Sequence, residues 1–80
     1  MTQVEIEYCV PCGMLDRAQD VQHALLEEYG ERLDSVALVT GDSGVFEVRA
    51  DGETIFDKEE DEFDMDAIVA SVGESVSASA

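Results

Sequence analysis

The sequence predicts a single small domain of the α/β (α+β) class, with two helices covering a four-stranded mixed sheet. Apolar residues alternate with polar ones in short stretches typical of strands, and in two other stretches they recur every three or four positions, as in amphipathic helices. An Asp-Gly pair separates two of the alternating stretches, which indicates a tight hairpin. Because 80 residues can bury one core and no more, we expect one domain, over residues 1–72.

The first half of the chain predicts a strand, a helix and a second strand. The first strand covers residues 3–8, where alternation of apolar residues with glutamates is typical of one buried face. The second covers residues 34–40, whose nearly continuous apolar run indicates a strand covered on both faces and parallel to the first. Between them an amphipathic helix ends near Gly30, which suits the left-handed capping position. The apolar positions of this helix are Met14, Ala18, Val21, Leu25 and Tyr29.

The second half predicts a hairpin that completes the sheet. Residues 45–50 and the returning residues 53–58 flank Asp51 and Gly52, and this dipeptide readily takes the positive φ angles of a two-residue turn. A right-handed crossover makes the first two strands parallel, and the hairpin adds two antiparallel strands. We therefore expect the sheet order 2-1-3-4, a minimal thioredoxin-like arrangement of strand, helix, three strands and helix.

The chain ends in a predicted helix and a predicted tail. The helix covers residues 65–72, with Asp64 as its N-cap. Residues 73–80 are small and polar with nothing large to bury, so we expect them to be disordered.

The charge of the chain is extreme, with 20 acidic against 4 basic residues and a net charge of −16. Nucleic acid is not an expected partner, because binding phosphates requires clustered basic residues. Such a surface repels itself at low ionic strength, but near 1 M salt the screening length falls to about 3 Å. We interpret the composition as that of a salt-adapted, halophilic protein; the alternative is an acidic protein with no special adaptation.

The expected location is the cytoplasm. The sequence has no apolar run of about 18 residues that could span a membrane, so no membrane association is expected. Its first residues are acidic where a signal peptide would be basic and then apolar. In a reducing cytoplasm, two closely spaced cysteines indicate redox chemistry or metal binding rather than a structural staple.

Both cysteines lie in the segment YCVPCG, between the first strand and the first helix. Unpaired N–H groups at a helix start favour the thiolate form of a nearby sulfur. The two-residue gap lets one sulfur attack a mixed disulfide formed by the other. We therefore predict that Cys9 and Cys12 are a redox-active pair. Their loop consists of Val10, Pro11 and Gly13, and its proline should stiffen it by fixing φ.

Other interpretations of the cysteines are weaker. A structural zinc site needs four ligands, and His23 lies about three turns down the helix, so metal binding would require two chains to share a site. Inert packing of small buried cysteines is common, but Gly and Pro at this junction argue against it. Arg17 is the one nearby cation that could offset repulsion between a thiolate and the acidic surface. Phe46 is a core residue or part of a contact surface beside the sulfurs.

The chain resembles the selenoprotein W and Rdx family of small thioredoxin-like proteins over about residues 3–72. The resemblance rests on YCVPCG, on GVFEV at residues 44–48 and on DGETIFDK at residues 51–58. It implies a thiol redox protein that acts with glutathione or protein thiols. Cys9 then matches the first cysteine of the family, and Cys12 matches the position that holds selenocysteine in selenoprotein members. Gly44 and Phe46 of the second stretch, with Arg17, are assigned supporting roles.

Two features depart from the pattern. Cysteine at position 12 is a slower nucleophile than selenocysteine, which argues against peroxidase-like activity. Thioredoxins also place a cis-proline opposite the cysteines, whereas the sole proline here is Pro11, so the loop around residues 41–45 must form the facing wall. Which sulfur attacks first stays open, since thioredoxin logic favours Cys9 and the family alignment favours Cys12.

The leading hypothesis is a small monomeric thiol–disulfide redox protein that needs no cofactor and exchanges with thiol proteins or low-molecular-weight thiols. Whether it turns over as an enzyme, a thiol–disulfide oxidoreductase, stays open. The main alternative is a non-catalytic interaction module whose partner binding is tuned by oxidation, and a metal carrier is a third possibility.

Overall fold

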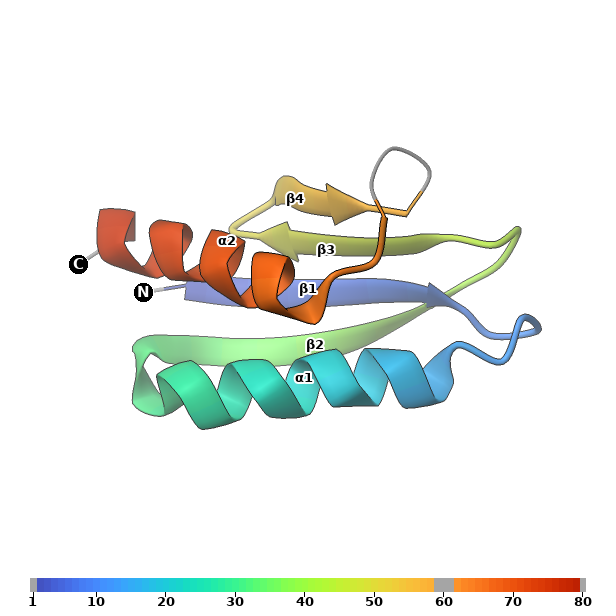
Figure 1. The fold of residues 1–80 in the computed structure, drawn as a ribbon, viewed down its shortest axis with the longest axis horizontal. Helices are drawn as coiled ribbons and strands as arrows, with labels where there is room; N and C mark the ends of the chain where they lie inside the picture. Colours follow the sequence, from blue (N-terminus) through green and yellow to red (C-terminus); the bar gives the residue numbers. More distant parts are fainter. Residues whose placement is uncertain (1, 59–61, 80) are drawn as a thin grey trace.

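The computed structural model describes residues 2–58 and 62–79 and confirms the predicted α+β, thioredoxin-like fold (Figure 1). Both helices lie on the same face of a four-stranded sheet, so the molecule has two layers. In chain order the elements are β1 (Thr2–Cys9), α1 (Leu15–Tyr29), the short 3-10 helix η1 (Gly30–Arg32), β2 (Leu33–Gly41), β3 (Phe46–Ala50), β4 (Glu53–Asp57) and α2 (Met65–Ser79).

The strand order is β2-β1-β3-β4, as predicted. β1 pairs in parallel with β2 and antiparallel with β3, and β3 pairs antiparallel with β4. The hairpin turn between β3 and β4 contains Asp51 at φ 52° and Gly52 at φ 84°, the left-handed conformations that this dipeptide favours. At the other end of the sheet, Cys9 is in register with Gly41.

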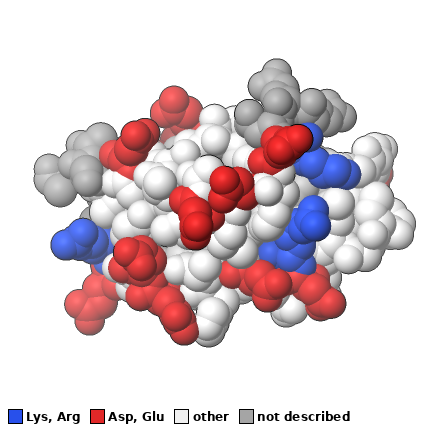
Figure 2. Space-filling model, in the orientation of Figure 1, with Lys and Arg blue, Asp and Glu red and all other residues white. Residues whose placement is uncertain are grey.

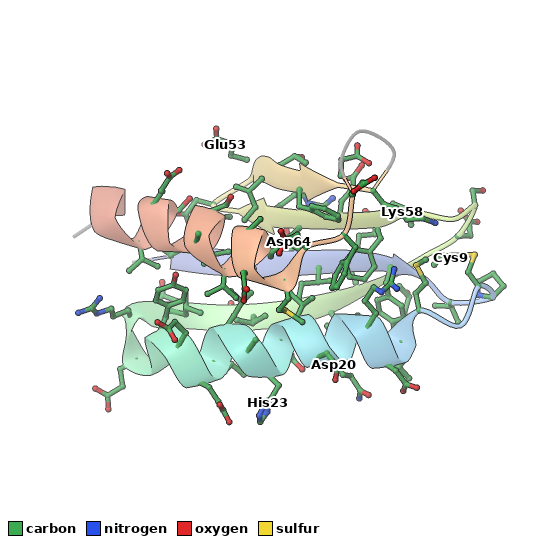
Figure 3. The ribbon with its side chains drawn as sticks, in the orientation of Figure 1. Cys9, Asp20, His23, Glu53, Lys58 and Asp64 are labelled. Atoms are coloured by element: carbon green, nitrogen blue, oxygen red, sulfur yellow. A yellow bond between two sulfur atoms is a disulfide. The ribbon has the colours of Figure 1, made fainter. Side chains whose placement is uncertain are left out.

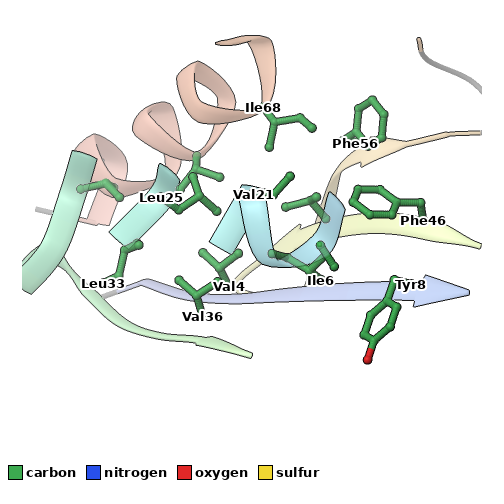
Figure 4. Packing of buried hydrophobic residues seen from close by; sticks show 14 residues of the cluster. Val4, Ile6, Tyr8, Val21, Leu25, Leu33, Val36, Phe46, Phe56 and Ile68 are labelled. Carbon is green, nitrogen blue, oxygen red and sulfur yellow. The ribbon is translucent and has the colours of Figure 1, made fainter. Parts of the chain in front are cut away.

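The core lies between the sheet and the two helices. Val4 and Ile6 of β1 face Val21 and Leu25 of α1, and all four side chains are fully buried (Figure 4). Ile68 of α2 packs into the same cluster. This arrangement follows from the predicted patterns, because residues two apart on a strand and three or four apart on a helix share a face.

Both predicted helix caps are present. Gly30 has φ 47°, and its N–H donates to the carbonyl of Leu26, which ends α1. The Oδ1 of Asp64 accepts a hydrogen bond from the N–H of Ala67 at 3.3 Å, as an N-cap of α2 should. Neither described helix is long and apolar enough to cross a membrane.

The second strand differs from the prediction. It was expected to be covered on both faces, but β2 forms one edge of the sheet, and Ala37 on its outer face is exposed. The physical reason is that both helices pack on the same side, which leaves the opposite face of the sheet without a layer. An apolar run therefore predicted a strand here without predicting how much of it is covered.

The end of the chain also differs from the prediction. Disorder was predicted from residue 73, yet α2 continues to Ser79. Val76 is buried four residues after buried Val72, so the apolar face of the helix extends one further turn. A Cβ at Gly73 would overlap the hydroxyl of Tyr29, so the glycine allows close approach of α1, and that hydroxyl donates a hydrogen bond to the carbonyl of Val69.

Candidate functional site

The two cysteines form a disulfide at the end of β1. Cys9 is the last residue of that strand, and Cys12 lies in the turn that leads to α1. Their Cα atoms are 5.3 Å apart, and the sulfurs are bonded. The two sulfurs are therefore close enough to bond, as predicted.

Backbone hydrogen bonds tie the turn to both neighbouring elements. The N–H of Val10 donates to the carbonyl of Gly41 at 3.1 Å, which anchors the turn to the end of β2. The N–H of Gly13 donates to Val10 at 3.2 Å, and the N–H of Met14 donates to Cys9 at 3.4 Å. Gly13 has φ 74°, a left-handed conformation that glycine adopts without the strain a side chain would add. The predicted loop residues thus shape a turn that is anchored at both ends.

The turn leads directly into the amino end of α1. Helical residues begin at Leu15, and Met14 at the N-cap position provides no side-chain hydrogen bond. The first N–H groups of α1 therefore lack a capping side chain, and their partial positive charge favours an anion in this region. Cys12 precedes the helix by two residues, so the sulfurs lie before the first helical turn and not within it.

The two cysteines differ sharply in exposure. Cys9 is 0% exposed, whereas Cys12 is an exposed residue, as are Val10 and Pro11 between them. An external thiol or disulfide can therefore reach the sulfur of Cys12 directly, but reaching Cys9 requires the turn to open. Sequence reasoning left the order of attack open, because thioredoxin logic favours Cys9 and the family alignment favours Cys12.

The supporting residues occupy distinct positions near this end of the sheet. Phe46 is 1% exposed and in register with Tyr8, so it is a core residue and not part of an exposed surface. Gly44, at φ 80°, lies in the turn between β2 and β3. Arg17, in the first turn of α1, has its guanidinium carbon 4.5 Å from the ring centroid of Phe63. Its described partner is thus an aromatic ring.

Sequence reasoning did not single out Lys58 and Phe63 as members of this end of the molecule. The ammonium of Lys58 donates to the carbonyl of Gly44 at 3.4 Å, and Figure 3 shows Lys58 and Cys9 at the same end of the sheet. Phe63 packs edge to face on Phe46 and Phe56, with centroids 6.0 and 6.2 Å away. The available signal was Phe63 itself, a large apolar residue in an otherwise charged stretch.

His23 is not near the cysteines. It lies on the outer side of α1 and forms an exposed pair with Glu27 at 2.8 Å (Figure 3). Within the described residues, no group of three or more His, Cys, Asp or Glu side chains is arranged to hold a metal ion. A metal carrier would therefore need ligands other than those that the described residues of one chain bring together.

Acidic side chains are spread over the surface, as Figure 2 shows for one face. On the uncovered face of the sheet, Arg49 contacts Glu47, Glu7 and Glu5 at 2.9, 3.2 and 3.6 Å. Burial lowers the pKa of Arg49, but the hydrogen bond that its guanidinium donates to Glu7 and the charges of the three glutamates outweigh burial, so its pKa is raised overall. Arg49 therefore stays charged and relieves repulsion among carboxylates that the sheet brings together.

Comparisons with known proteins agree with the geometry. A family model described as the Rdx family matches residues 3–74. A crystal structure of a protein from Bordetella parapertussis is similar at a TM-score of 0.87 and 30% identity, covering 92% of this chain and 96% of that one. The crystal structure of a selenoprotein W-related protein from Vibrio cholerae is similar at a TM-score of 0.87 and 26% identity, covering 94% and 96%. A comparison with curated proteins finds no match.

Proposed function

The chain belongs to the Rdx family, and on that premise we propose that it is a small thiol–disulfide redox protein whose Cys9 and Cys12 cycle between dithiol and disulfide. The observation that carries the proposal is the contrast between a buried and an exposed cysteine residue in one bonded pair. A buried structural disulfide would be closed to exchange, whereas a bond with one exposed sulfur is open to attack by an external thiolate.

The exposed sulfur gives the exchange a direction. In the reduced protein, the Cys12 thiolate attacks one sulfur of a substrate disulfide and forms a mixed disulfide, and the first substrate thiolate leaves and takes a proton from water. The Cys9 thiolate then attacks the Cys12 sulfur, which re-forms the internal bond and releases the second substrate thiol. Two electrons pass from the two thiolates to the substrate disulfide, and the released substrate thiolates take their protons from water. The reverse cycle begins with attack of a substrate thiolate on Cys12.

Two features of the site support a reactive Cys12. The uncapped amino end of α1 favours a thiolate in the preceding turn, and the backbone bonds of Val10 and Gly13 hold this turn in one shape. The net charge of −16 acts in the opposite sense, because it disfavours another anion. Molar salt screens this long-range repulsion, so the site suits a salt-rich cytoplasm.

The proposed partners are thiol proteins or low-molecular-weight thiols, and the protein acts as a monomer. The chemistry passes through sulfur atoms alone, so no cofactor is needed. A second candidate function is a docking module tuned by oxidation. It is favoured by the exposed apolar Val10 and Leu15 beside the disulfide, which are 50% and 44% exposed.

A redox titration tests the proposal. The protein is equilibrated in mixtures of reduced and oxidised glutathione of increasing potential, quenched in acid and alkylated, and the fraction of free thiol is measured by mass. We expect a two-electron transition between about −270 and −180 mV, the range of thioredoxin, glutaredoxins and protein disulfide isomerase. Two thiols that still alkylate fully at about −150 mV would contradict it. If a variant with both cysteines changed to serine bound a protein partner with unchanged affinity, the docking module would be favoured.

A further inference from the structure

The two edges of the sheet differ in how they are protected. β4, at one edge, carries Glu53 and Asp57 among its five residues. β2, at the other edge, has nine residues and a single charged one, Asp34. Long edge strands with few charges are templates for an added strand, and proteins usually block them with charged side chains. In so acidic a chain, a nine-residue edge strand with one charged residue is unusual, and this distinguishes the β2 edge from the β4 edge.

The outward backbone groups of β2 can be assigned from two hydrogen bonds. The carbonyl of Gly41 accepts from Val10, so the polar backbone groups of Gly41 point toward β1. Because these groups alternate in direction along a strand, those of Val36, Leu38 and Thr40 point outward. The side chain of Gln22 confirms this, since its Nε2 donates to the Val36 carbonyl at 2.7 Å.

This bond occupies one outward carbonyl and leaves the second half of the edge open. Among the described residues, no side-chain or turn hydrogen bond reaches the outward N–H and C=O groups of Leu38 and Thr40. Thr40 is exposed and Leu38 half-buried. These four groups have the spacing that an extended peptide matches when it adds to a sheet.

Two exposed leucines of α1 flank the edge of β2, and one of them lies beside the open segment. Leu15 and Leu26 lie seven positions before and four after Gln22, so the three share the side of α1 that faces β2. They are 44% and 45% exposed, and with Val10 at 50% they are the exposed large hydrophobic residues of the described chain. α1 runs opposite to β2, which places Leu15 beside the end of β2 at the disulfide and Leu26 beside its start (Figure 1).

We propose that the outer edge of β2 at residues 38–40 binds an extended, cysteine-containing segment of a protein substrate as an added strand and so delivers its sulfur to Cys12. This inference rests on the proposed function and names its substrate class. Cys9 is in register with Gly41, so the open segment of β2 ends at the same end of the sheet as the turn that holds Cys12. The charged residues that bracket the segment, Asp34 and Asp42, are acidic, so basic residues beside the substrate cysteine complement this edge.

The chemistry on the bound segment is the exchange described above. The Cys12 thiolate breaks the substrate S–S bond and forms a mixed disulfide with the bound cysteine, and the other half of the substrate leaves as a thiol. Cys9 then breaks the mixed disulfide and restores the internal bond. The strand dissociates with its cysteine reduced, and dithiothreitol supplies the electrons for the next cycle.

The test uses a ten-residue peptide of alternating Val and Lys with one central cysteine, blocked as a disulfide with 2-mercaptoethanol. Two further versions of the peptide carry backbone N-methyl groups. One version has them on the odd-numbered residues and the other on the even-numbered residues. In an added strand only one set of N–H groups faces β2, whether it lies parallel or antiparallel. We expect one N-methylated version to react about tenfold more slowly with the dithiothreitol-reduced protein, from loss of one or two hydrogen bonds. The other should match the unmodified peptide.

Two protein variants locate the binding edge. Leu15→Gln should slow exchange with the peptide severalfold. Leu26→Gln is the matched control, because Leu26 is the same residue type and equally exposed but lies at the far end of α1. It should leave the rate of exchange unchanged. Both variants should reduce 2-hydroxyethyl disulfide, a small neutral substrate, at the rate of the parent protein. This readout also shows that each variant is folded and active.

A binding measurement separates this inference from the proposed function. A peptide with serine in place of its cysteine should slow hydrogen exchange at the Leu38 and Thr40 amides of the oxidised protein, where no thiol chemistry takes place. If both N-methylated peptides react as quickly as the parent and these amides are unaffected, the inference is wrong, even if 2-hydroxyethyl disulfide is reduced. If that small disulfide is not reduced while the amides are protected, the strand site stands and the redox proposal fails.

Discussion

The guanidinium carbon of Arg17 lies 4.5 Å from the ring centroid of Phe63, which joins the first turn of α1 to the segment before α2. Phe63 in turn packs against Phe46 and Phe56, so the cation stacks on an aromatic cluster rooted in the core. This contact fixes Phe63 against α1 at the disulfide end of the sheet.

Replacing either partner of this contact should lower the stability of the protein, and replacing Phe63 should lower it more than replacing Arg17. Phe63→Ala deletes a half-buried ring with two aromatic neighbours and should cost about 2–3 kcal/mol in the free energy of unfolding. Arg17→Gln removes only the cation and should cost about 0.5–1 kcal/mol. Urea unfolding followed by circular dichroism measures both. Equal costs would show that the ring acts only through Arg17, and the packing described here would be wrong.

Salt should stabilise the protein. The net charge of −16 repels itself most strongly at low ionic strength, and screening shortens from about 10 Å at 0.1 M to about 3 Å at 1 M salt. The midpoint of thermal unfolding should therefore rise by several degrees or more between 0.1 M and 1 M KCl. Equal concentrations of NaCl serve as a control for ion identity. An unchanged midpoint would contradict salt adaptation.

Gly73→Ala should destabilise the protein, although alanine is the better helix former by about 1 kcal/mol. A Cβ at this position overlaps the Tyr29 hydroxyl, which bonds the Val69 carbonyl. Tyr29→Phe removes that hydroxyl and should cost about 1 kcal/mol on its own. In the Tyr29→Phe background, Gly73→Ala should then be neutral or stabilising. A double-mutant cycle with no coupling would refute the close helix contact.

Stability should also fall in alkali through Tyr29. Burial is the main cause that raises its pKa above the ordinary 10.0, and the charge of Glu28 adds to it. The folded protein therefore holds this proton more tightly than the unfolded chain. The stability that results is fully present below pH 10 and is lost as the pH rises through the folded pKa. Urea titrations from pH 8 to 11 should show a smaller loss for Tyr29→Phe than for the parent.

Local patterns predicted most of the fold because each strand, helix and turn has its own periodicity or turn residues. Val4 and Ile6 showed one buried face, and Asp51 with Gly52 showed the hairpin, so the sheet order followed from general rules of handedness. The cysteine pair was predictable for the same reason, since the spacing of Cys9 and Cys12 and their place between strand and helix are local features.

What escaped prediction depends on contacts between distant segments. The apolar run of β2 looks the same whether one or two faces are covered, because coverage depends on where both helices pack. The last turn of α2 exists because Val76 reaches the core, and residues 73–79 alone have little tendency to form a helix. The anchoring of the cysteine turn likewise depends on the Val10 bond to Gly41, which joins segments about thirty positions apart.

The most direct test of the account compares how quickly each cysteine reacts when the other is replaced. In Cys9→Ser, the exposed Cys12 thiol should react with iodoacetamide at least about tenfold faster than Cys9 does in Cys12→Ser, because reaching Cys9 requires local opening. In 8 M urea the two rates should become similar. Only Cys9→Ser should form a mixed disulfide readily with 2-hydroxyethyl disulfide. Equal rates in the folded variants, or faster reaction of Cys9, would contradict a cycle that starts at Cys12.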